Sequence, residues 1–247
     1  MSIAEKLTTV AENVPKVYES GQKAEYDRFW DIYQQSGIRG SYDNAFAGSG
    51  WTTENFKPKY DINATNAYML FRANTMEIDL VEYLENLGIT LSVSNANGIQ
   101  YAFNNSRFTH IGVVDARKTT TNVSLDTTFS NNQNLVTIDK IILNPEVKTA
   151  QFSNTFTQCV ALENIAFEGE IKTNGLNLQW STKLSKESIT NIINVLSSTT
   201  TGLTVTLSKT AVNNAFGINV DDETTYPEGT EYYNLRHSKD NWTISYV

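Results

Sequence analysis

Hydrophobic and polar positions recur in one pattern along the middle of the chain. In each copy, a phenylalanine is followed three residues later by a small or amide side chain, then by an apolar residue and an isoleucine. The three copies are Phe103–Ser106–Phe108–Ile111, Phe129–Asn132–Leu135–Ile138 and Phe156–Cys159–Leu162–Ile165. The phenylalanines stand 26 and 27 residues apart. A fixed period of this length predicts stacked units, each adding one turn of chain and one short strand.

Alternation within a unit predicts which side chains are buried. In the second unit the aliphatic residues indicate the buried face and the polar residues the exposed face. These are Leu135, Ile138 and Ile141 or Leu143 on the buried face, and Thr137, Asp139 and Lys140 on the exposed face. The small side chains of Ser106, Asn132 and Cys159 are expected where the chain bends, either bonded to backbone groups of the next unit or packed where a larger side chain would not fit. One unit cannot bury its own apolar face, so the pattern predicts a leucine-rich-repeat solenoid.

Apolar residues at heptad-like spacing predict a helical segment over residues 1–36. They follow one another in alternating steps of four and three, at Ile3, Leu7, Val10, Val14 and Val17. Pro15 removes a backbone donor and is expected to break or kink the helix. Two interpretations stay open, namely a helix folded back on its own domain and a stalk through which the chain forms a homo-oligomer.

The next segment, residues 37–66, is rich in glycine and aromatic side chains and has no period. It is predicted to be a connector that packs through its aromatic residues. Aromatic rings exposed in such a loop can bind sugars, and Trp51 is the candidate in this segment, although such rings more often anchor their own loop.

Residues 67–247 are predicted to form the repeat domain with a carboxyl-terminal α/β cap, which makes the fold class α+β. The first unit is degenerate, and a helix with Leu80, Tyr83, Leu84 and Leu87 on one face is expected to follow it, ending at Gly88. The cap contains a helix beginning at Ser185, a strand over 203–207, a short helix closed by Gly217, and a last strand over 242–246.

Composition and charge narrow the class of function. The net charge of −8 and the pI near 4.8 disfavour a phosphate-binding surface, so no nucleic-acid partner is expected. A single cysteine excludes an internal disulfide framework. No apolar run has the length of a membrane span, and the amino terminus has no secretory signal pattern, so we expect synthesis in the cytoplasm without membrane insertion.

The residue set contains no signature of catalysis. The chain has two histidines, and a pairing of His110 with Cys159 is not expected because Cys159 falls in the structural column. Carboxylates are scattered too evenly to nominate an acid and base pair. We therefore expect no enzyme activity and no cofactor. A calcium site using the acidic run 221–223 stays open, although such runs are usually solvated loops.

Two stretches, "SNANGIQYAFNNSRFTHIGVVD" and "TFTQCVALENIAFEG", resemble the BspA-like leucine-rich repeats. The whole chain is similar to leucine-rich-repeat proteins encoded in phages and prophages of Firmicutes, often among tail and other structural genes. This resemblance implies a ligand-binding or structural role. BspA-like proteins usually carry a secretion signal and this chain has none, which favours a virion or tail-associated protein released from the host cytoplasm by lysis.

The candidate binding residues are outward positions of the repeat strands together with two tryptophans. They are Trp51, Thr109, Thr137, Asp139, Asn164 and Trp180. The expected partners are other virion or tail proteins and a host cell-surface glycan or protein. The alternative is a cytosolic or surface-exposed leucine-rich-repeat module that binds another protein and has no place in a virion.

Overall fold

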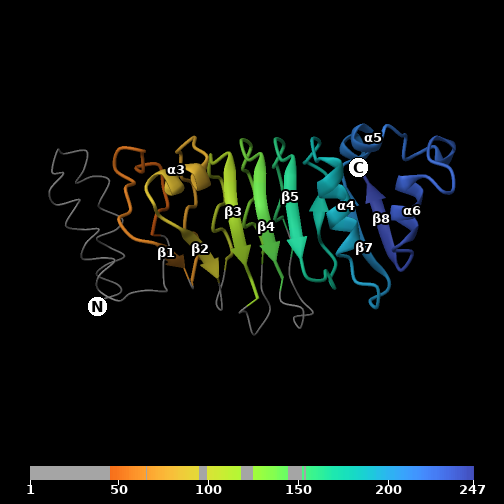
Figure 1. Cartoon of the computed structure of the whole chain (residues 1–247), viewed down its shortest axis with the longest axis horizontal. Helices are drawn as coiled ribbons and strands as arrows, with labels where there is room; N and C mark the ends of the chain where they lie inside the picture. Colours follow the sequence, from red (N-terminus) through yellow and green to blue (C-terminus); the bar gives the residue numbers. More distant parts are fainter. Residues whose placement is uncertain (1–44, 65, 95–98, 118–124, 144–151, 153) are drawn as a thin grey trace.

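The computed structural model describes residues 45–64, 66–94, 99–117, 125–143, 152 and 154–247. Both the helical segment predicted over residues 1–36 and the first part of the predicted connector lie outside the described residues. The described elements follow one another along a single long axis, in the order of the sequence (Figure 1).

In the described part of the chain, the larger sheet has five parallel strands that are ordered as in the sequence. The strands are β1 (Ile62–Ala64), β2 (Leu91–Ser94), β3 (His110–Asp115), β4 (Thr137–Ile142) and β5 (Asn164–Glu168). Equivalent positions of the repeat pair across the strands, since Ile111 aligns with Ile138 and Ile138 with Ile165. All three isoleucines are at most 3% exposed, as the alternation predicted.

The phenylalanines of successive repeats stack on one another. Phe71, Phe103, Phe129 and Phe156 follow each other at centroid distances of 5.7 Å, with interplanar angles of 18°, 7° and 9°. Phe46 extends the row, stacking on Phe71 at 5.3 Å. We call these described rings the phenylalanine ladder. Each ring is fully buried, so the ladder forms a continuous aromatic core beside the sheet.

A repeated backbone turn positions each ring of the ladder. The residues two before and two after the last four ladder phenylalanines all have positive φ between 54° and 62°: Met69, Ala73, Tyr101, Asn105, Thr127, Asn131, Asn154 and Gln158. Non-glycine residues adopt this conformation at a cost of about 1–2 kcal/mol each. In return, the backbone N–H of Phe103 donates to the Thr128 carbonyl at 3.0 Å. The N–H of Phe129 likewise donates to the Thr155 carbonyl at 3.2 Å, which makes a second hydrogen-bond ladder between repeats.

The column of small side chains fastens neighbouring repeats together. Asn132 Oδ1 accepts the backbone N–H of Ser106 in the preceding repeat at 2.7 Å. Likewise, Asn74 Nδ2 and Cys159 Sγ donate to backbone carbonyls that precede them, at 3.1 and 3.0 Å. The predicted direction, toward the next unit, is therefore wrong for Asn132 and Cys159. Burial raises the pKa of the Cys159 thiol to about 12, so the sulfur stays protonated as a donor.

The packed structure begins earlier than the boundary predicted at residue 67. Strand β1 lies within the predicted connector 37–66 and pairs with β2. Phe46, in the same segment, belongs to the ladder. Trp51 and Phe56 pack edge-to-face against Phe46, with centroid distances of 5.5 and 5.0 Å. The described part of this segment is thus the amino-terminal end of the core. Its lack of a clear period concealed that role.

Helix α3 (Leu80–Asn86) is inserted before β2, and its first turn is capped by Asp79, whose side chain accepts a hydrogen bond from the Glu82 N–H at 2.9 Å. Leu80 and Leu84 are buried, as predicted. Leu87 was predicted on the same face, but it lies after the helix and is 40% exposed. The helix ends at Asn86, and Leu87 is its carboxyl-terminal cap residue, with the side chain directed to solvent.

The carboxyl-terminal cap agrees with the predicted order of elements. Ser185 caps α4 (Lys186–Asn194), and Gly217 closes α5 (Lys209–Phe216) in the left-handed conformation. The remaining elements are β6 (Asn177–Leu178), β7 (Leu203–Leu207), the 3-10 helix η1 (Glu223–Thr225), α6 (Glu231–His237) and β8 (Trp242–Tyr246). Strands β6, β7 and β8 form a second parallel sheet of three strands among the described residues.

Helix α4 seals the last edge of the larger sheet with side chains in place of a strand. Ser188 Oγ accepts the Ile165 N–H at 3.0 Å. Asn191 Oδ1 accepts the Phe167 N–H at 2.7 Å, and Asn191 Nδ2 donates to the Phe167 carbonyl at 3.1 Å. An unpaired strand edge invites pairing with another chain, and these bonds remove that opportunity from β5.

Replacing Phe129 by alanine is expected to lower the free energy of unfolding by about 3–5 kcal/mol, because a central ring of the ladder would be lost and leave a cavity. Urea denaturation followed by circular dichroism measures the change. Val160→Ala is the control, since Val160 is 40% exposed and its loss should change the free energy by less than about 0.5 kcal/mol. If the two variants had the same free energy of unfolding, the stacking of the rings would not be a source of stability.

Replacing Asn191 by alanine is expected to cost about 1–3 kcal/mol, because the Phe167 N–H and carbonyl would lose their partners at the sheet edge. Asn194→Ala is the matched control, being the same substitution in the same helix at an exposed position. The difference between the two urea midpoints isolates the edge bonds from helix propensity. Identical midpoints would show that the hydrogen bonds between Asn191 and Phe167 do not stabilise the fold.

Candidate functional site

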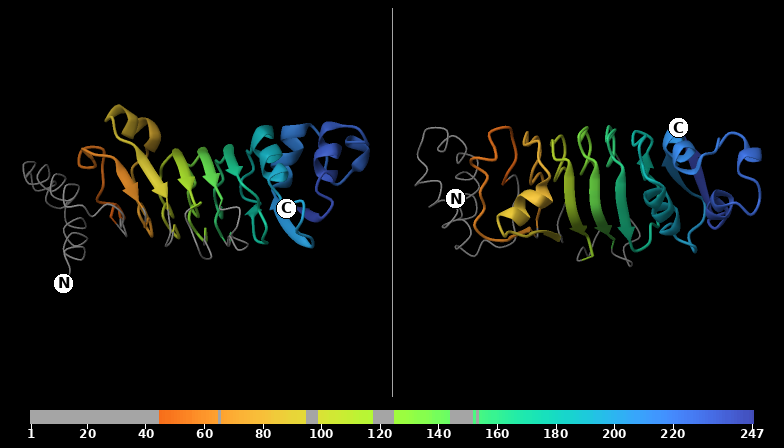
Figure 2. Two further views of the ribbon diagram at one scale, coloured as in Figure 1. Left: turned by 60° about the horizontal axis from the view of Figure 1, so that its bottom comes forward. Right: turned by 45° about the horizontal axis from the view of Figure 1, so that its top comes forward.

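Two helices flank an uncovered part of the larger sheet. Figure 2 shows α3 and α4 rising on the same side of this sheet, with β4 and β5 between them. Thr137, Asp139, Asn164 and Ala166 point outward here, and they line one hollow with Glu187, Ser188 and Asn191 of α4. We call the four strand residues the open face. Hydroxyl, amide and carboxylate groups thus lie together on a rigid sheet with a helical wall.

Three of the six predicted binding residues meet on the open face. Thr137 and Asn164 are paired in the sheet register, and Asp139 is two residues further along β4. Thr109 immediately precedes β3, and its carbonyl accepts the N–H groups of both Val136 and Thr137, at 2.8 and 3.1 Å. The backbone of Thr109 is thus bonded to the loop that leads into β4. Thr109 lies beside the open face and does not line the hollow at β4 and β5.

The two tryptophans lie apart from the open face. Trp180 is 42% exposed and follows β6 in the cap, so it belongs to a different part of the surface. Trp51 is 2% exposed and packs against Phe46 and Phe56. The prediction that Trp51 belongs to a binding surface is corrected accordingly, because its ring is part of the core and a ligand cannot reach it.

A histidine with carboxylates on both ring nitrogens stands next to the open face. His110 Nδ1 lies 2.9 Å from Asp79 Oδ2, and His110 Nε2 lies 2.7 Å from Asp139 Oδ1. We call these three residues the histidine clasp. It joins the amino-terminal cap of α3 to β3 and β4. Sequence reasoning missed it, although the repeat alignment places His110 opposite Thr137 and therefore close to Asp139.

The charge of the clasp follows from its geometry. Burial of the ring by itself lowers the pKa of His110, but the hydrogen bonds and negative charges of Asp139 and Asp79 raise it by more, and the net pKa lies above the ordinary 6.5. Because each ring nitrogen is hydrogen-bonded to a carboxylate, neither is free to take a proton from a nucleophile. The clasp therefore acts as a bridge between the start of α3 and the larger sheet.

Under α3 lies a hollow of about 200 Å³, the α3 hollow. It opens at the amino ends of β2 and β3, which pair at their carboxyl ends through Val93 and Ser94. Its inner wall consists of side chains at most 5% exposed: Leu80, Leu84, Ile89, Val93, Phe103 and Ile111. Glu85, Thr90, Val113 and Asp139 line it as well and are more exposed. A Cβ on Gly112 would meet Val81 Cγ2 at 3.3 Å, so glycine lets α3 approach the sheet closely.

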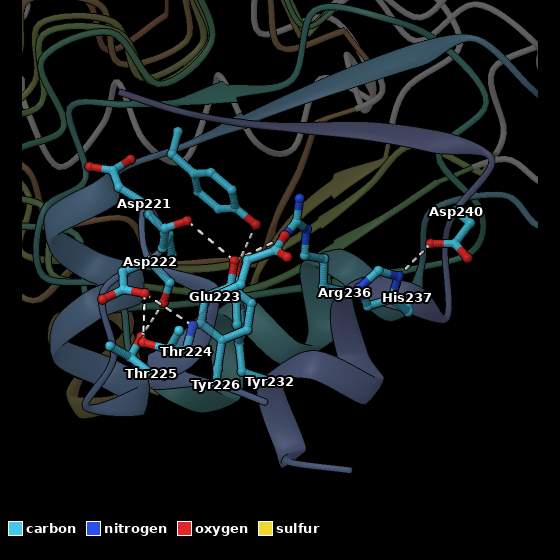
Figure 3. Close-up of polar contacts among 12 residues, drawn as sticks. Asp221, Asp222, Glu223, Thr224, Thr225, Tyr226, Tyr232, Arg236, His237 and Asp240 are labelled. Carbon is cyan, nitrogen blue, oxygen red and sulfur yellow. Dashed lines mark hydrogen bonds and ion pairs between the residues drawn. The ribbon is translucent and has the colours of Figure 1, made fainter. Parts of the chain in front are cut away.

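The acidic run 221–223 does not gather its carboxylates at one point (Figure 3). Asp221 pairs with Lys209 at 2.6 Å, and Glu223 pairs with Arg236 at 3.0 Å. Asp222 caps η1 by accepting from the N–H and hydroxyl of Thr224. Among the described residues, no group of three or more histidine, cysteine, aspartate or glutamate side chains is placed to hold a metal ion. The calcium alternative thus gains no support from this loop.

The tyrosines beside this run pack the end of the cap. Arg236 donates to the Tyr226 hydroxyl at 2.8 Å, and the Tyr226 hydroxyl donates to the Val220 carbonyl at 3.2 Å (Figure 3). The Tyr232 and Tyr246 hydroxyls are hydrogen-bonded to each other. Burial raises the pKa of Tyr232 far above its ordinary range, so its hydroxyl stays protonated. These contacts give the tyrosine cluster a structural role at the end of the cap.

Comparison of the chain with protein-family models, curated proteins and solved structures found no match. Within the described ranges, no helix combines the length and apolar character needed to cross a bilayer.

Stability is expected to fall with rising pH through the histidine clasp. Because the pKa of His110 is raised in the folded chain, its stabilising contribution is complete below pH 6.5 and is lost as the pH rises through the folded pKa. Between pH 6 and 8.5, the free energy of unfolding of wild type should fall by about 0.2–1 kcal/mol more than that of His110→Gln. This is the size of effect expected for partly exposed ion pairs. Urea midpoints across this range measure the difference.

The other histidine provides the control for this measurement. His237 pairs with Asp240 on the cap, three residues away and largely exposed. His237→Gln should retain the pH dependence of wild type. If His110→Gln also retained it, the clasp would not be the titrating element.

Proposed function

We propose that this chain is a non-enzymatic, BspA-like leucine-rich-repeat protein associated with a phage tail or another part of a virion. In this proposal the repeat units form a solenoid whose open face binds a protein or another component of the host surface. Residues 1–36 attach the chain to the particle or to sister chains.

The open face carries the binding part of the proposal. Thr137, Asp139 and Asn164 present polar groups on paired strands, while α3 and α4 rise on either side. A sheet holds such groups in fixed relative positions, which favours specific recognition over loose adsorption. Between the two helices, the face offers a bounded surface on which an extended partner can lie.

The repeated contacts support the solenoid part. The stacked rings recur from one repeat to the next, and the N–H of each of Phe103 and Phe129 donates to the carbonyl of the residue just before the following ladder phenylalanine. Units that bury their apolar sides only against neighbours behave in this way in repeat proteins. Such proteins serve mainly as extended binding surfaces, in agreement with the proposed role.

Two observations favour binding over catalysis. Both ring nitrogens of His110 are occupied by carboxylates, so the ring is not available as a general base. The thiol of Cys159 is buried and its pKa is raised to about 12, which leaves it without nucleophilic character at neutral pH. The virion part of the proposal depends on the sequence resemblance.

The virion role is tested by inducing a host that carries the gene and purifying the released particles on a density gradient. Mass spectrometry should find the chain in the particle fraction at a fixed ratio to the tail proteins. A chain that is absent from the particles but retained in cell extract would overturn the virion assignment and favour the interaction module.

The role of the open face is tested with purified chain and host cell walls. Asn164→Arg places a bulky cation on the exposed face of β5 and should reduce retention at least tenfold. Thr201→Arg, an exposed loop position in the cap, is the matched control and should bind as wild type. Equal retention of both variants by the walls would contradict binding through the open face.

A further inference from the structure

We infer that the α3 hollow receives a lysine side chain from an extended segment of a partner protein that lies on the open face. This inference rests on the proposed binding function and names the chemistry of its occupant. It combines three properties of the hollow: an apolar interior, acidic residues among its more exposed lining, and continuity with the open face.

The interior suits an aliphatic stem. The deepest side chains, including Phe103 and Ile111, are at most 1% exposed and carry no polar groups. A lysine stem has four methylene groups, which lie favourably along apolar surface while the ammonium group stays at the rim. A volume of about 200 Å³ leaves room for such a stem without displacing α3.

The charged residues lining the hollow are carboxylates. Glu85 and Asp139 line the α3 hollow, and Asp139 and Glu187 line the adjoining hollow of the open face. Neither hollow has a lysine or arginine among its described lining residues. The nearby base, Lys140, pairs instead with Glu168 at 2.8 Å. The histidine clasp with a protonated ring keeps a net single negative charge, to which Glu85 adds another.

The arrangement of acceptors favours an ammonium over a guanidinium group. Asp139 Oδ1 already accepts from His110 Nε2, which leaves Oδ2 as the oxygen facing Gly112, 3.8 Å from where a Cβ would stand. The second carboxylate, Glu85, comes from α3 on the other wall. Arginine prefers two coplanar oxygens of one carboxylate, whereas an ammonium accepts separate single acceptors.

The open face explains why the lysine would belong to a protein segment. Asp139 lines both hollows, so a side chain in the α3 hollow places its backbone over β4. There Thr137 and Asn164 offer hydroxyl and amide groups to peptide bonds. A free polyamine would have the same cationic group, but it carries donors only and has no carbonyl to accept from the Asn164 amide or the Thr137 hydroxyl.

The test titrates full-length, isotope-labelled chain with short capped peptides, followed by NMR shifts of the Gly112 and Val113 amides. The peptide acetyl-Gly-Lys-Gly-amide should bind at least fivefold more tightly than the same peptide with norleucine, which has the stem and no charge. Glu85→Lys should abolish that preference. Glu82→Lys is the control on the same helix, because Glu82 does not line the hollow, and it should retain the preference.

Several outcomes would overturn the inference. Equal binding of the norleucine peptide would make the hollow a purely apolar site, and tighter binding of the arginine peptide would reject the ammonium assignment. Spermidine binding as tightly as the lysine peptide would reject a protein segment as the occupant. Absence of shifts at Gly112 with every peptide would reject the hollow itself.

The two proposals fail separately. If the lysine preference is present and host walls do not retain the chain, the proposed host-surface role fails while the site remains. If Asn164→Arg abolishes retention and no peptide shifts the Gly112 amide, the open face binds its target and the lysine site fails.

Discussion

The stacking of one phenylalanine on the next is the interaction on which the rest of the structure depends. Each described ring is fully buried, and each ring inside the row stacks on the rings before and after it. The rings of three successive repeats stack at the same centroid distance of 5.7 Å and nearly parallel, so the ladder and the spacing of the repeats match each other. The left-handed turns around each ring then direct the backbone N–H groups at the following repeat, and the strands on the other side of each unit align in register.

The proposed binding surface lies where this regular arrangement is interrupted. Helix α3 is inserted where β2 and β3 separate, which creates a hollow that a continuous sheet would fill. The histidine clasp holds the start of this helix against β3 and β4. Helix α4 replaces the next strand and forms the opposite wall. The site is thus formed where two helices depart from the repeat, on a sheet that the repeat keeps rigid.

Sequence pattern predicted the parts of the fold that depend on local rules. Alternation identified Leu135 and Ile138 as buried, and capping chemistry identified Ser185 and Gly217 as helix boundaries. The pattern failed where the same backbone shape is adopted by unlike residues. Met69, Tyr101 and Thr127 share one left-handed position, so similarity of side chains understates the number of repeats. Because side-chain similarity to the other repeats is lacking there too, the sequence predicts a connector at Phe46 and Trp51, which belong to the core.

The sheet ends with side chains of a helix, and this determines how long the repeat array can be. A strand at the edge would offer a new row of donors and acceptors to any similar strand, from this chain or another. Asn191 instead uses its amide to imitate a peptide group once and offers nothing further to pair with. Strand addition therefore stops at the carboxyl-terminal edge of the five-stranded sheet. A further strand cannot pair with the Phe167 edge of β5 while α4 stays in place.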